Sequence, residues 1–194
     1  MRLRRGTAPA VAAVDLSKTF GSVTAVQGVS FEVARGEIFA LLGSEGAGKS
    51  TILRMLCTLT VPTGGRAAVA GYDVVERPRA VRRRVGLVTG GETMRAPVPE
   101  VLFLDEPAAG SDAAGRAGLW HDLRRLRDEG VTVVFTTSSL DDAQHADRIA
   151  VIDDGRVAAL GTPAALRAGR PGWPLRAPGD ELGAARRFMA AHRH

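Results

Sequence analysis

Hydrophobic and polar positions along the chain alternate between strand-like and helix-like runs. Continuous apolar runs of the buried-strand type lie at residues 38–42, 101–104 and 131–136. Residues 50–59 and 113–129 instead carry apolar side chains at helical spacing, and Gly130 is placed to end the second of these helices. This alternation predicts an α/β fold with a mostly parallel sheet flanked by helices.

Shorter patterns complete the expected order of elements. Residues 11–16 and 29–34, on either side of a turn at Gly21, predict an antiparallel N-terminal strand pair. The other expected elements are a hairpin at 66–75, a basic helix at 78–84, a strand at 85–88, a helix that follows residue 136 and runs through 146, and a hairpin at 149–160 around Asp154-Gly155.

Composition narrows the class of protein. The chain has 194 residues, of which 45% are hydrophobic and 24% charged, as in an average globular domain. Its apolar runs are far shorter than the ~18 residues of a membrane helix, and the basic N-terminus is not followed by an apolar signal segment. We therefore expect a cytoplasmic protein with one domain at 1–169 and a tail rich in Gly, Pro and Arg at 170–194.

Charge and cysteine content exclude two further classes. The formal charge is +5, but the bases are scattered and only 5% of residues are aromatic, so no nucleic-acid partner is expected. The single cysteine, Cys57, excludes a disulfide framework and a cysteine-rich metal site.

The clearest chemical signal is a glycine-rich loop between the strand at 38–42 and the helix that follows. It matches the pattern G-x-x-x-x-G-K-[ST] with Gly43, Ser44, Glu45, Gly46, Ala47, Gly48, Lys49 and Ser50. Such a loop turns backbone N–H groups toward phosphate oxygens, Lys49 reaches the β- and γ-phosphates, and the Ser50 hydroxyl ligates Mg²⁺. The alternative is a glycine-rich turn without a ligand, and the order strand, loop, helix favours a nucleotide site.

A second signal lies at the end of the strand at 101–104. Asp105 follows this strand at the edge of the sheet where α/β folds bind ligands, and it would hold Mg²⁺. Glu106 would orient and deprotonate an attacking water. The alternative is an ordinary strand end, where acidic residues are common.

Together these segments resemble the ATP-binding cassette (ABC) ATPases, and most closely the nucleotide-binding subunits of daunorubicin-resistance-type drug exporters. The resemblance covers about residues 14–168 and rests on 43–51, 104–107, 110–112 and 146–156. It implies a P-loop NTPase fold, and ATP and Mg²⁺ as cofactors. It also implies that Thr51 belongs to the phosphate-binding run, that Phe20 stacks on adenine, and that Asp112 is the D-loop aspartate.

The chain departs from the family pattern in three places. Only residues 89–100 lie where the family has a glutamine, a helical subdomain and an L-S-G-G-Q signature, so the glutamine and the helical subdomain are absent. Residues 89–92 are either a signature remnant or a plain loop. Ser138 replaces the family's switch histidine, and Glu45 places a carboxylate where the family has Asn or Ser.

These features predict an ATP-binding subunit of an exporter that binds and hydrolyses Mg-ATP with impaired turnover and drives transport through a membrane-spanning permease. Such a subunit lies on the inner face of the cell membrane. An intact ABC ATPase partner could complete one of its sites. The alternative is a degenerate or regulatory nucleotide-binding protein without useful hydrolysis. A DNA-associated ABC ATPase would need inserts for which residues 89–100 leave no room.

Overall fold

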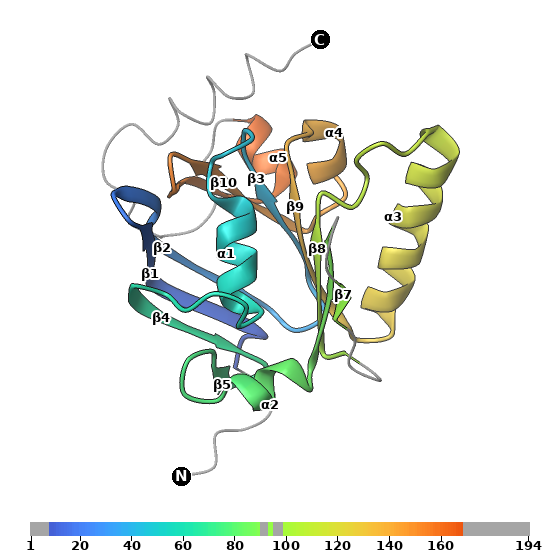
Figure 1. Cartoon of the computed structure of the whole chain (residues 1–194). Coiled ribbons are helices and arrows are strands. Elements are labelled where there is room, and N and C mark those ends of the chain that lie inside the picture. Colours follow the sequence, from blue (N-terminus) through green and yellow to red (C-terminus); the bar gives the residue numbers. More distant parts are fainter. Residues whose placement is uncertain (1–7, 90–92, 95–98, 169–194) are drawn as a thin grey trace.

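The computed structural model describes residues 8–89, 93–94 and 99–168, which form two sheets with helices between and beside them (Figure 1). The smaller sheet is antiparallel and has the strand order β2–β1–β4–β5. Its strands are β1 (Val11–Phe20), β2 (Val23–Val33), β4 (Gly64–Val69) and β5 (Tyr72–Asp73).

The larger sheet has seven strands in the order β11–β10–β3–β9–β8–β6–β7. They are β3 (Ile38–Leu42), β6 (Val85–Val88), β7 (Thr93–Met94), β8 (Val101–Asp105), β9 (Thr132–Thr137), β10 (Arg148–Asp153) and β11 (Arg156–Gly161). The five central strands are parallel, and the two edge strands pair antiparallel. The predicted α/β fold, with its mostly parallel sheet and antiparallel N-terminal pair, is confirmed.

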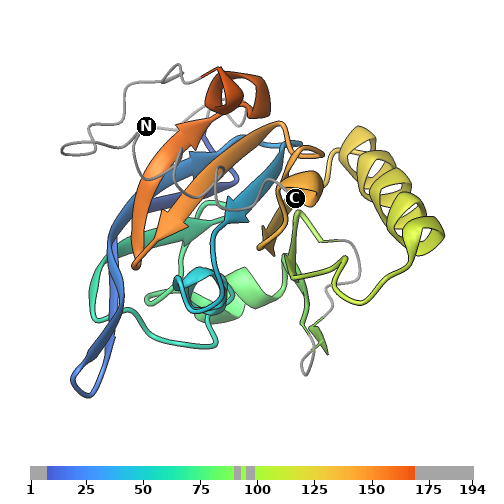
Figure 2. The same cartoon turned by 90° about the horizontal axis from the view of Figure 1, so that it is seen from above.

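The helices divide the apolar core into two parts. Helix α1 (Lys49–Leu56) lies between the two sheets, whereas α3 (Ala113–Asp128), α4 (Leu140–Ala143) and α5 (Pro163–Arg167) cover the other face of the larger sheet (Figures 1 and 2). Strand β3 is buried on both faces: Phe39 and Leu41 pack toward α1, and Ile38, Ala40 and Leu42 toward the other helices. This two-sided burial explains its continuous apolar run.

The first helix is shorter than the sequence predicts, because it ends at Leu56 rather than at residue 59. Thr58 adopts the left-handed backbone conformation with φ +61°, and the Leu59 N–H donates to the Arg54 carbonyl at 2.9 Å. This is the bond pattern of a helix C-terminus. The position is usually glycine, so the apolar spacing alone does not reveal it.

The helix expected to run through residue 146 was also predicted too long. Helix α4 has four residues, and the bonds from His145 N–H to the Asp142 carbonyl and from Ala146 N–H to the Ala143 carbonyl span only three residues. The chain then turns into β10, since the Asp147 N–H donates to the Ile38 carbonyl at 2.8 Å.

The N-terminal strands are longer than predicted. Asp15 has φ +49°, and register shifts between Ala13 and Lys18 interrupt the regular alternation of β1. The pairing nevertheless continues to Phe20 opposite Val23. A bulge of this kind breaks the period-two pattern without ending the strand.

The connection from β6 to β8 contains no helix within the residues that the structure describes. Strand β7 pairs antiparallel with Leu87 and Val88, and the Glu100 N–H donates to the Arg84 carbonyl at 2.7 Å just before β8 begins. Residues 90–92, which include most of the candidate signature remnant, and the tail at 170–194 lie outside the described ranges. Helix α2 (Pro78–Arg82) precedes β6, and none of the described helices is long and apolar enough to cross a membrane.

Candidate functional site

The glycine-rich loop follows β3 and is packed too closely for other residues at two of its positions. A Cβ on Gly43 would lie 2.3 Å from the Ile152 carbonyl oxygen. Gly48 has φ +100°, and a Cβ there would lie 2.4 Å from the Ala25 carbonyl oxygen. These glycines therefore let the loop lie directly against the backbone of β10 and β2.

A turn far along the sequence braces the same loop. The Gly155 N–H, between β10 and β11, donates to the Ala47 carbonyl at 3.0 Å. The Gln27 N–H of β2 donates to the Gly155 carbonyl at 2.7 Å, and Gln27 Nε2 donates to the Asp154 carbonyl at 2.9 Å. The Asp154-Gly155 turn was predicted as a hairpin, but its contact with the loop could not be inferred from sequence spacing.

Lys49 is the first residue of α1 and is only 5% exposed. Its Nζ donates to the carbonyl oxygens of Gly43 at 2.8 Å and Ser44 at 3.0 Å, and it lies 3.3 Å from Glu106 Oε1. A buried ammonium needs such acceptors, because burial without partners is costly. The loop therefore holds one fixed positive charge beside the carboxylate of Glu106.

Asp105 ends β8 beside the start of α1. The Ser50 hydroxyl donates to Asp105 Oδ1 at 2.9 Å, so the two oxygen donors predicted for Mg²⁺ lie in contact. Within the described residues no group of three or more His, Cys, Asp or Glu side chains could hold a metal. One carboxylate and one hydroxyl nevertheless fit Mg²⁺, which keeps several waters and commonly takes the rest of its ligands from substrate phosphates.

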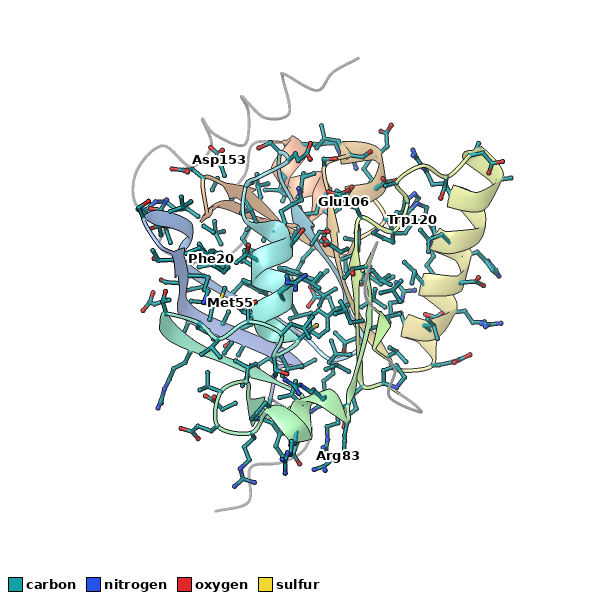
Figure 3. All side chains as sticks on the ribbon, in the orientation of Figure 1. Phe20, Met55, Arg83, Glu106, Trp120 and Asp153 are labelled. Atoms are coloured by element: carbon teal, nitrogen blue, oxygen red, sulfur yellow. The ribbon has the colours of Figure 1, made fainter. Side chains whose placement is uncertain are left out.

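Glu106 lies one residue farther on, at the end of β8 in Figure 3. Its backbone has φ +48°, a conformation that is uncommon for a residue other than glycine and typical of functional sites. Its Oε2 accepts a hydrogen bond from the Ser138 N–H at 3.3 Å, and its Oε1 faces Lys49. The side chain is 36% exposed, so water can reach it.

Thr136, which the sequence argument passed over, joins the two acidic residues. Its hydroxyl donates to Asp105 Oδ1 and accepts from the Glu106 N–H at 2.9 Å. The signal was present in the Thr-Thr-Ser run of residues 136–138, but attention fell on Ser138 as the site of a missing histidine.

The remaining predicted residues differ in their exposure and in their local contacts. Ser44, Glu45 and Gly46 are exposed on the loop, and Thr51 is partly buried in α1. Phe20 ends β1, is 51% exposed and has Lys18 Nζ 4.9 Å from its ring centroid. Asp112 caps α3 by accepting from the Gly115 N–H at 2.8 Å, a structural role that the sequence argument did not assign.

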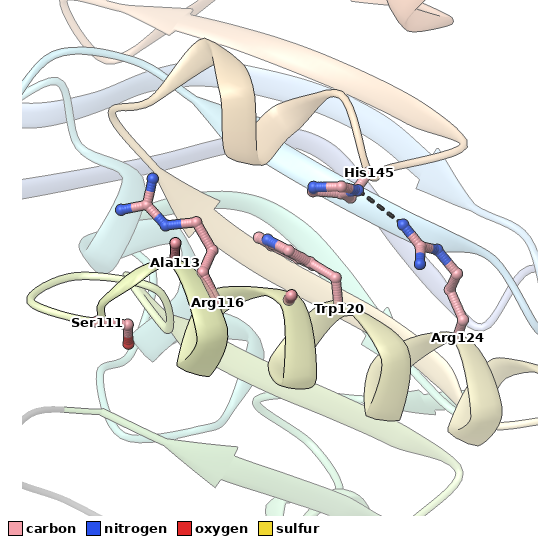
Figure 4. Close-up of a pocket in the computed structure, with 7 residues that line it drawn as sticks. Ser111, Ala113, Arg116, Trp120, Arg124 and His145 are labelled. Carbon is pink, nitrogen blue, oxygen red and sulfur yellow. Dashed lines mark hydrogen bonds between the residues drawn. The ribbon is translucent and has the colours of Figure 1, made fainter.

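A cavity of about 500 Å³ lies between α3 and the segment after α4, and its lining includes the two residues on either side of Asp112 (Figure 4). Its lining consists of Ser111, Ala113, Arg116, Ala117, Trp120, Arg124 and His145. The Trp120 and His145 rings stack with centroids 4.6 Å apart, and Arg124 Nη2 lies 2.8 Å from His145 Nδ1. Burial and the neighbouring Arg124 charge lower the pKa of His145.

A family model and individual relatives point to the same family. A family model described as ABC transporter matches residues 26–96. The daunorubicin resistance ATP-binding protein DrrA3 of Streptomyces coeruleorubidus is 36% identical, over 78% of this chain and 67% of that protein. The Nod factor export ATP-binding protein I of a Rhizobium species is 32% identical, over 79% of this chain and 72% of that protein.

Solved structures agree in fold. An ATP-binding subunit of an ABC transporter superimposes with a TM-score of 0.75 at 21% identity, covering 93% of this chain and 99% of that one. A bacterial Atm1-family ABC exporter superimposes with a TM-score of 0.79 at 19% identity, covering 97% of this chain and 42% of that one. These likenesses confirm the P-loop NTPase fold.

The alignment with DrrA3 also locates a difference in length. It extends over 213 residues, which is more than the 194 residues of the whole chain. DrrA3 therefore has residues inside the matched region that this chain lacks. An internally shortened chain, as predicted for residues 89–100, is consistent with this difference.

Proposed function

The chain belongs to the ATP-binding proteins of ABC transporters, and from this premise we propose that it binds Mg-ATP at the glycine-rich loop and hydrolyses it slowly. The observation that carries the proposal is the meeting of four predicted residues at the ends of β3 and β8. Lys49 lies 3.3 Å from Glu106, and Ser50 lies 2.9 Å from Asp105. Loop, cation, metal donors and base thus occupy one edge of the sheet, where α/β folds bind ligands.

Each loop residue has a part in binding. The backbone N–H groups of Ser44, Glu45, Gly46, Gly48 and Lys49 surround the phosphates, and the Thr51 N–H lies on the same helix start. Gly43 and Ala47 shape the loop instead, because their N–H groups donate to the Thr137 carbonyl at 3.1 Å and the Ser44 carbonyl at 3.2 Å. The Glu45 side chain is exposed, and a carboxylate directed at the nucleotide would repel the phosphates. Phe20 stacks its exposed ring on the adenine. Asp112 acts as the D-loop aspartate, in the loop before α3.

Lys49 changes partner when phosphate arrives. Its ammonium leaves the carbonyl oxygens of Gly43 and Ser44 and pairs with the β- and γ-phosphates, whose charge is a stronger partner than a neutral carbonyl. This movement also separates Lys49 from Glu106 Oε1. Glu106 then orients a water toward the γ-phosphate and accepts its proton on a carboxylate oxygen. Ser50 and Asp105 would hold Mg²⁺, which neutralises charge on the phosphates when it is bound.

Turnover is slow because the residues that complete this chemistry in the family are missing. Ser138 offers Glu106 a backbone N–H at 3.3 Å, and its side chain is too short to act as the family's histidine does. No helix lies between β6 and β8 in the described part of the chain. These two observations favour the second candidate function, a degenerate or regulatory protein that binds nucleotide without useful hydrolysis.

Partners follow from the same premise. The names of the relatives refer to daunorubicin resistance and to Nod factor export, and both are ATP-binding proteins. We infer that this chain acts with a membrane-spanning permease at the inner face of the cell membrane. An intact ABC ATPase would serve it better than a second copy, because a copy brings no helical subdomain in its described part.

Turnover of ATP by the purified chain, compared with its Glu106→Gln variant, tests the reaction. Loss of a general base typically costs 10²- to 10⁴-fold, so the variant should lose at least about 100-fold in turnover while still binding ATP. The matched control is Glu129→Gln, which alters an exposed carboxylate at the end of α3 that lies 3.8 Å from Arg125, and it should leave turnover unchanged. Equal, measurable turnover in all three proteins would reject Glu106 as the base, and no turnover in the wild type would leave the second candidate function.

Sedimentation of the Glu106→Gln variant with ATP tests the inferred pairing. The chain should remain a monomer, because each site of a homodimer would lack the opposing signature. A stable ATP-dependent homodimer would show that residues 89–92 do serve as a signature and would favour the working ATPase.

A further inference from the structure

We propose that Thr136 is a positioning residue that orders Asp105 and Glu106 together and thereby sets how strongly Mg²⁺ increases ATP affinity. The proposal rests on the proposed function, since it concerns the metal donors of the same site. It assigns a role to a side chain that neither the motif pattern nor the family resemblance singled out.

The position of Thr136 follows from the sheet order. Strand β9 lies between β3 and β8, so Thr136 is paired with Leu41 on one side and with Asp105 on the other. The residue is fully buried, with 0% of its surface exposed. It therefore lies beneath the site rather than in it, within reach of the acidic residues but not of solvent.

The direction of both hydrogen bonds is fixed by chemistry. An ionised carboxylate only accepts, and a backbone N–H only donates. The Thr136 hydroxyl must therefore donate to Asp105 Oδ1 and accept from the Glu106 N–H at 2.9 Å. One hydroxyl thus links the side chain of the metal ligand to the backbone of the proposed base.

This link orients the carboxylate of Asp105. Within the described residues, Ser50 and Thr136 both donate to Oδ1, and no hydrogen bond to Oδ2 is present. Two donors on one oxygen hold the carboxylate plane in place and leave the other oxygen available to Mg²⁺ or to its bound water. Such second contacts behind a metal ligand commonly change metal affinity by 10- to 100-fold.

The same link supports the unusual backbone of Glu106. With φ +48°, this residue keeps its conformation only where surrounding bonds determine it, and its N–H has the Thr136 hydroxyl as acceptor. Ser138, by contrast, donates to the Glu106 side chain from its backbone N–H, at 3.3 Å. On β9, Thr136 is thus the side chain that orders the acidic pair.

The test compares Thr136→Val with Thr132→Val. Thr132 lies at the other end of β9, is 1% exposed, and its hydroxyl accepts from the Gly36 N–H at 3.0 Å. Both threonines are on β9, and each substitution removes a buried hydroxyl that accepts a hydrogen bond from a backbone N–H. Only the Thr136 hydroxyl also contacts the acidic pair, Asp105 and Glu106. Calorimetry measures the ATP affinity of each variant in the presence of Mg²⁺ and again with a chelator instead of Mg²⁺. The ratio of these two affinities gives the increase in ATP affinity that is due to the metal.

Thr136→Val should reduce this ratio about tenfold, because a hydrogen bond to a charged group is lost. Thr132→Val and the conservative Thr136→Ser should keep the wild-type ratio. An unchanged ratio in Thr136→Val would overturn the proposal, and so would an equal fall in Thr132→Val, which would mark a general effect of destabilisation.

Two controls separate an effect on the site from a failure to fold or to bind ATP. Thermal unfolding of each variant shows whether it is folded, and Thr136→Ala, which adds no methyl group beside Asp105, replaces the valine variant if that one does not fold. Failure of the wild-type chain to bind ATP at all would reject the proposed function rather than the role of Thr136.

Discussion

The region around Lys49 and Asp105, at the ends of β3 and β8, differs sharply from the segment that follows β9 and leads into α4. In the first region Lys49 has two carbonyl partners and a carboxylate beside it, and Asp105 receives two hydroxyl donors. In the second, α4 has only four residues, and three buried polar atoms nearby have no hydrogen-bond partner among the described residues: Arg116 Nε, Trp120 Nε1 and Asp142 Oδ1. Arg116 and Asp142 face each other as an ion pair at the long distance of 3.6 Å.

This difference separates two parts of the proposed chemistry. The well-bonded region is the one that we propose to hold phosphates and metal, and the loosely bonded region begins at Ser138, the position that matches the family's switch histidine. Buried polar atoms without partners reduce stability and leave their surroundings less fixed. The chain is thus better built to hold a nucleotide than to respond to it.

The largest effect is expected from Lys49→Ala, which removes the cation of the well-bonded region. Loss of charged hydrogen bonds to the phosphates should weaken ATP binding by about 3 kcal/mol, roughly 100-fold. Calorimetry checks this, with Arg125→Ala, an exposed cation on α3, as the control. If Lys49→Ala and wild type bound ATP equally well, the loop would not be the phosphate site.

The next effect concerns the packing of the same region. Gly43→Ala would place a Cβ 2.3 Å from a backbone carbonyl that cannot move easily, and overpacking of this kind typically costs about 1–3 kcal/mol of unfolding free energy. The same substitution at Gly118, in α3 with open space around it, should stabilise the chain by up to about 1 kcal/mol.

Urea unfolding of both glycine variants measures the difference. Opposite signs for one chemical change would show that the loop's glycine is required by contact with Ile152. A neutral Gly43→Ala would mean that the loop is not held against β10, and the contrast between the two regions would weaken.

The sequence predicted the well-bonded region better than the loose one for a physical reason. The loop motif, the buried run of β3 and the acids after β8 are local patterns, and each needs only its own neighbours to form. Ligand residues of α/β folds gather at the carboxyl ends of the parallel strands. This general rule, rather than closeness along the chain, led us to expect Lys49, Ser50, Asp105 and Glu106 together, and they lie together.

What the sequence did not reveal depends on partners far apart along the chain. The bracing of Ala47 by Gly155 spans more than a hundred residues, and the link from Thr136 to Asp105 requires β9 and β8 to be neighbours. The ends of α1 and α4 were misplaced because a left-handed Thr58 and the pairing of Asp147 with Ile38 override helical spacing.

A smaller effect is expected from Ser138→His, which restores the family's switch histidine in the loose region. A single preorganised donor can contribute 10²- to 10³-fold to a rate, but here its support, α4, is short. We therefore expect ATP turnover to rise less than about tenfold. A rise of 100-fold or more would show that the region around α4 is ordered enough to use the donor, contrary to the comparison drawn above.

The smallest effect is a pH dependence of stability from His145, in the loose region. Burial, and then the charge of Arg124, lower the pKa of His145, while Asp142 and Asp141 oppose this shift. Arg124 donates toward Nδ1, which requires that nitrogen to be unprotonated. The unfolded chain, with a histidine pKa of about 6.5, then binds the proton more readily than the folded chain. The contribution of His145 to the unfolding free energy should therefore be fully present above that pH and decrease as the pH falls through it.

Urea unfolding at pH 7.5 and 5.5 should show this decrease in wild type and a smaller one in His145→Asn. His121→Asn, on the outer side of α3, is the control and should behave as wild type. An equal decrease in all three proteins would assign the effect to other groups and would remove His145 as a source of weakness beside α4.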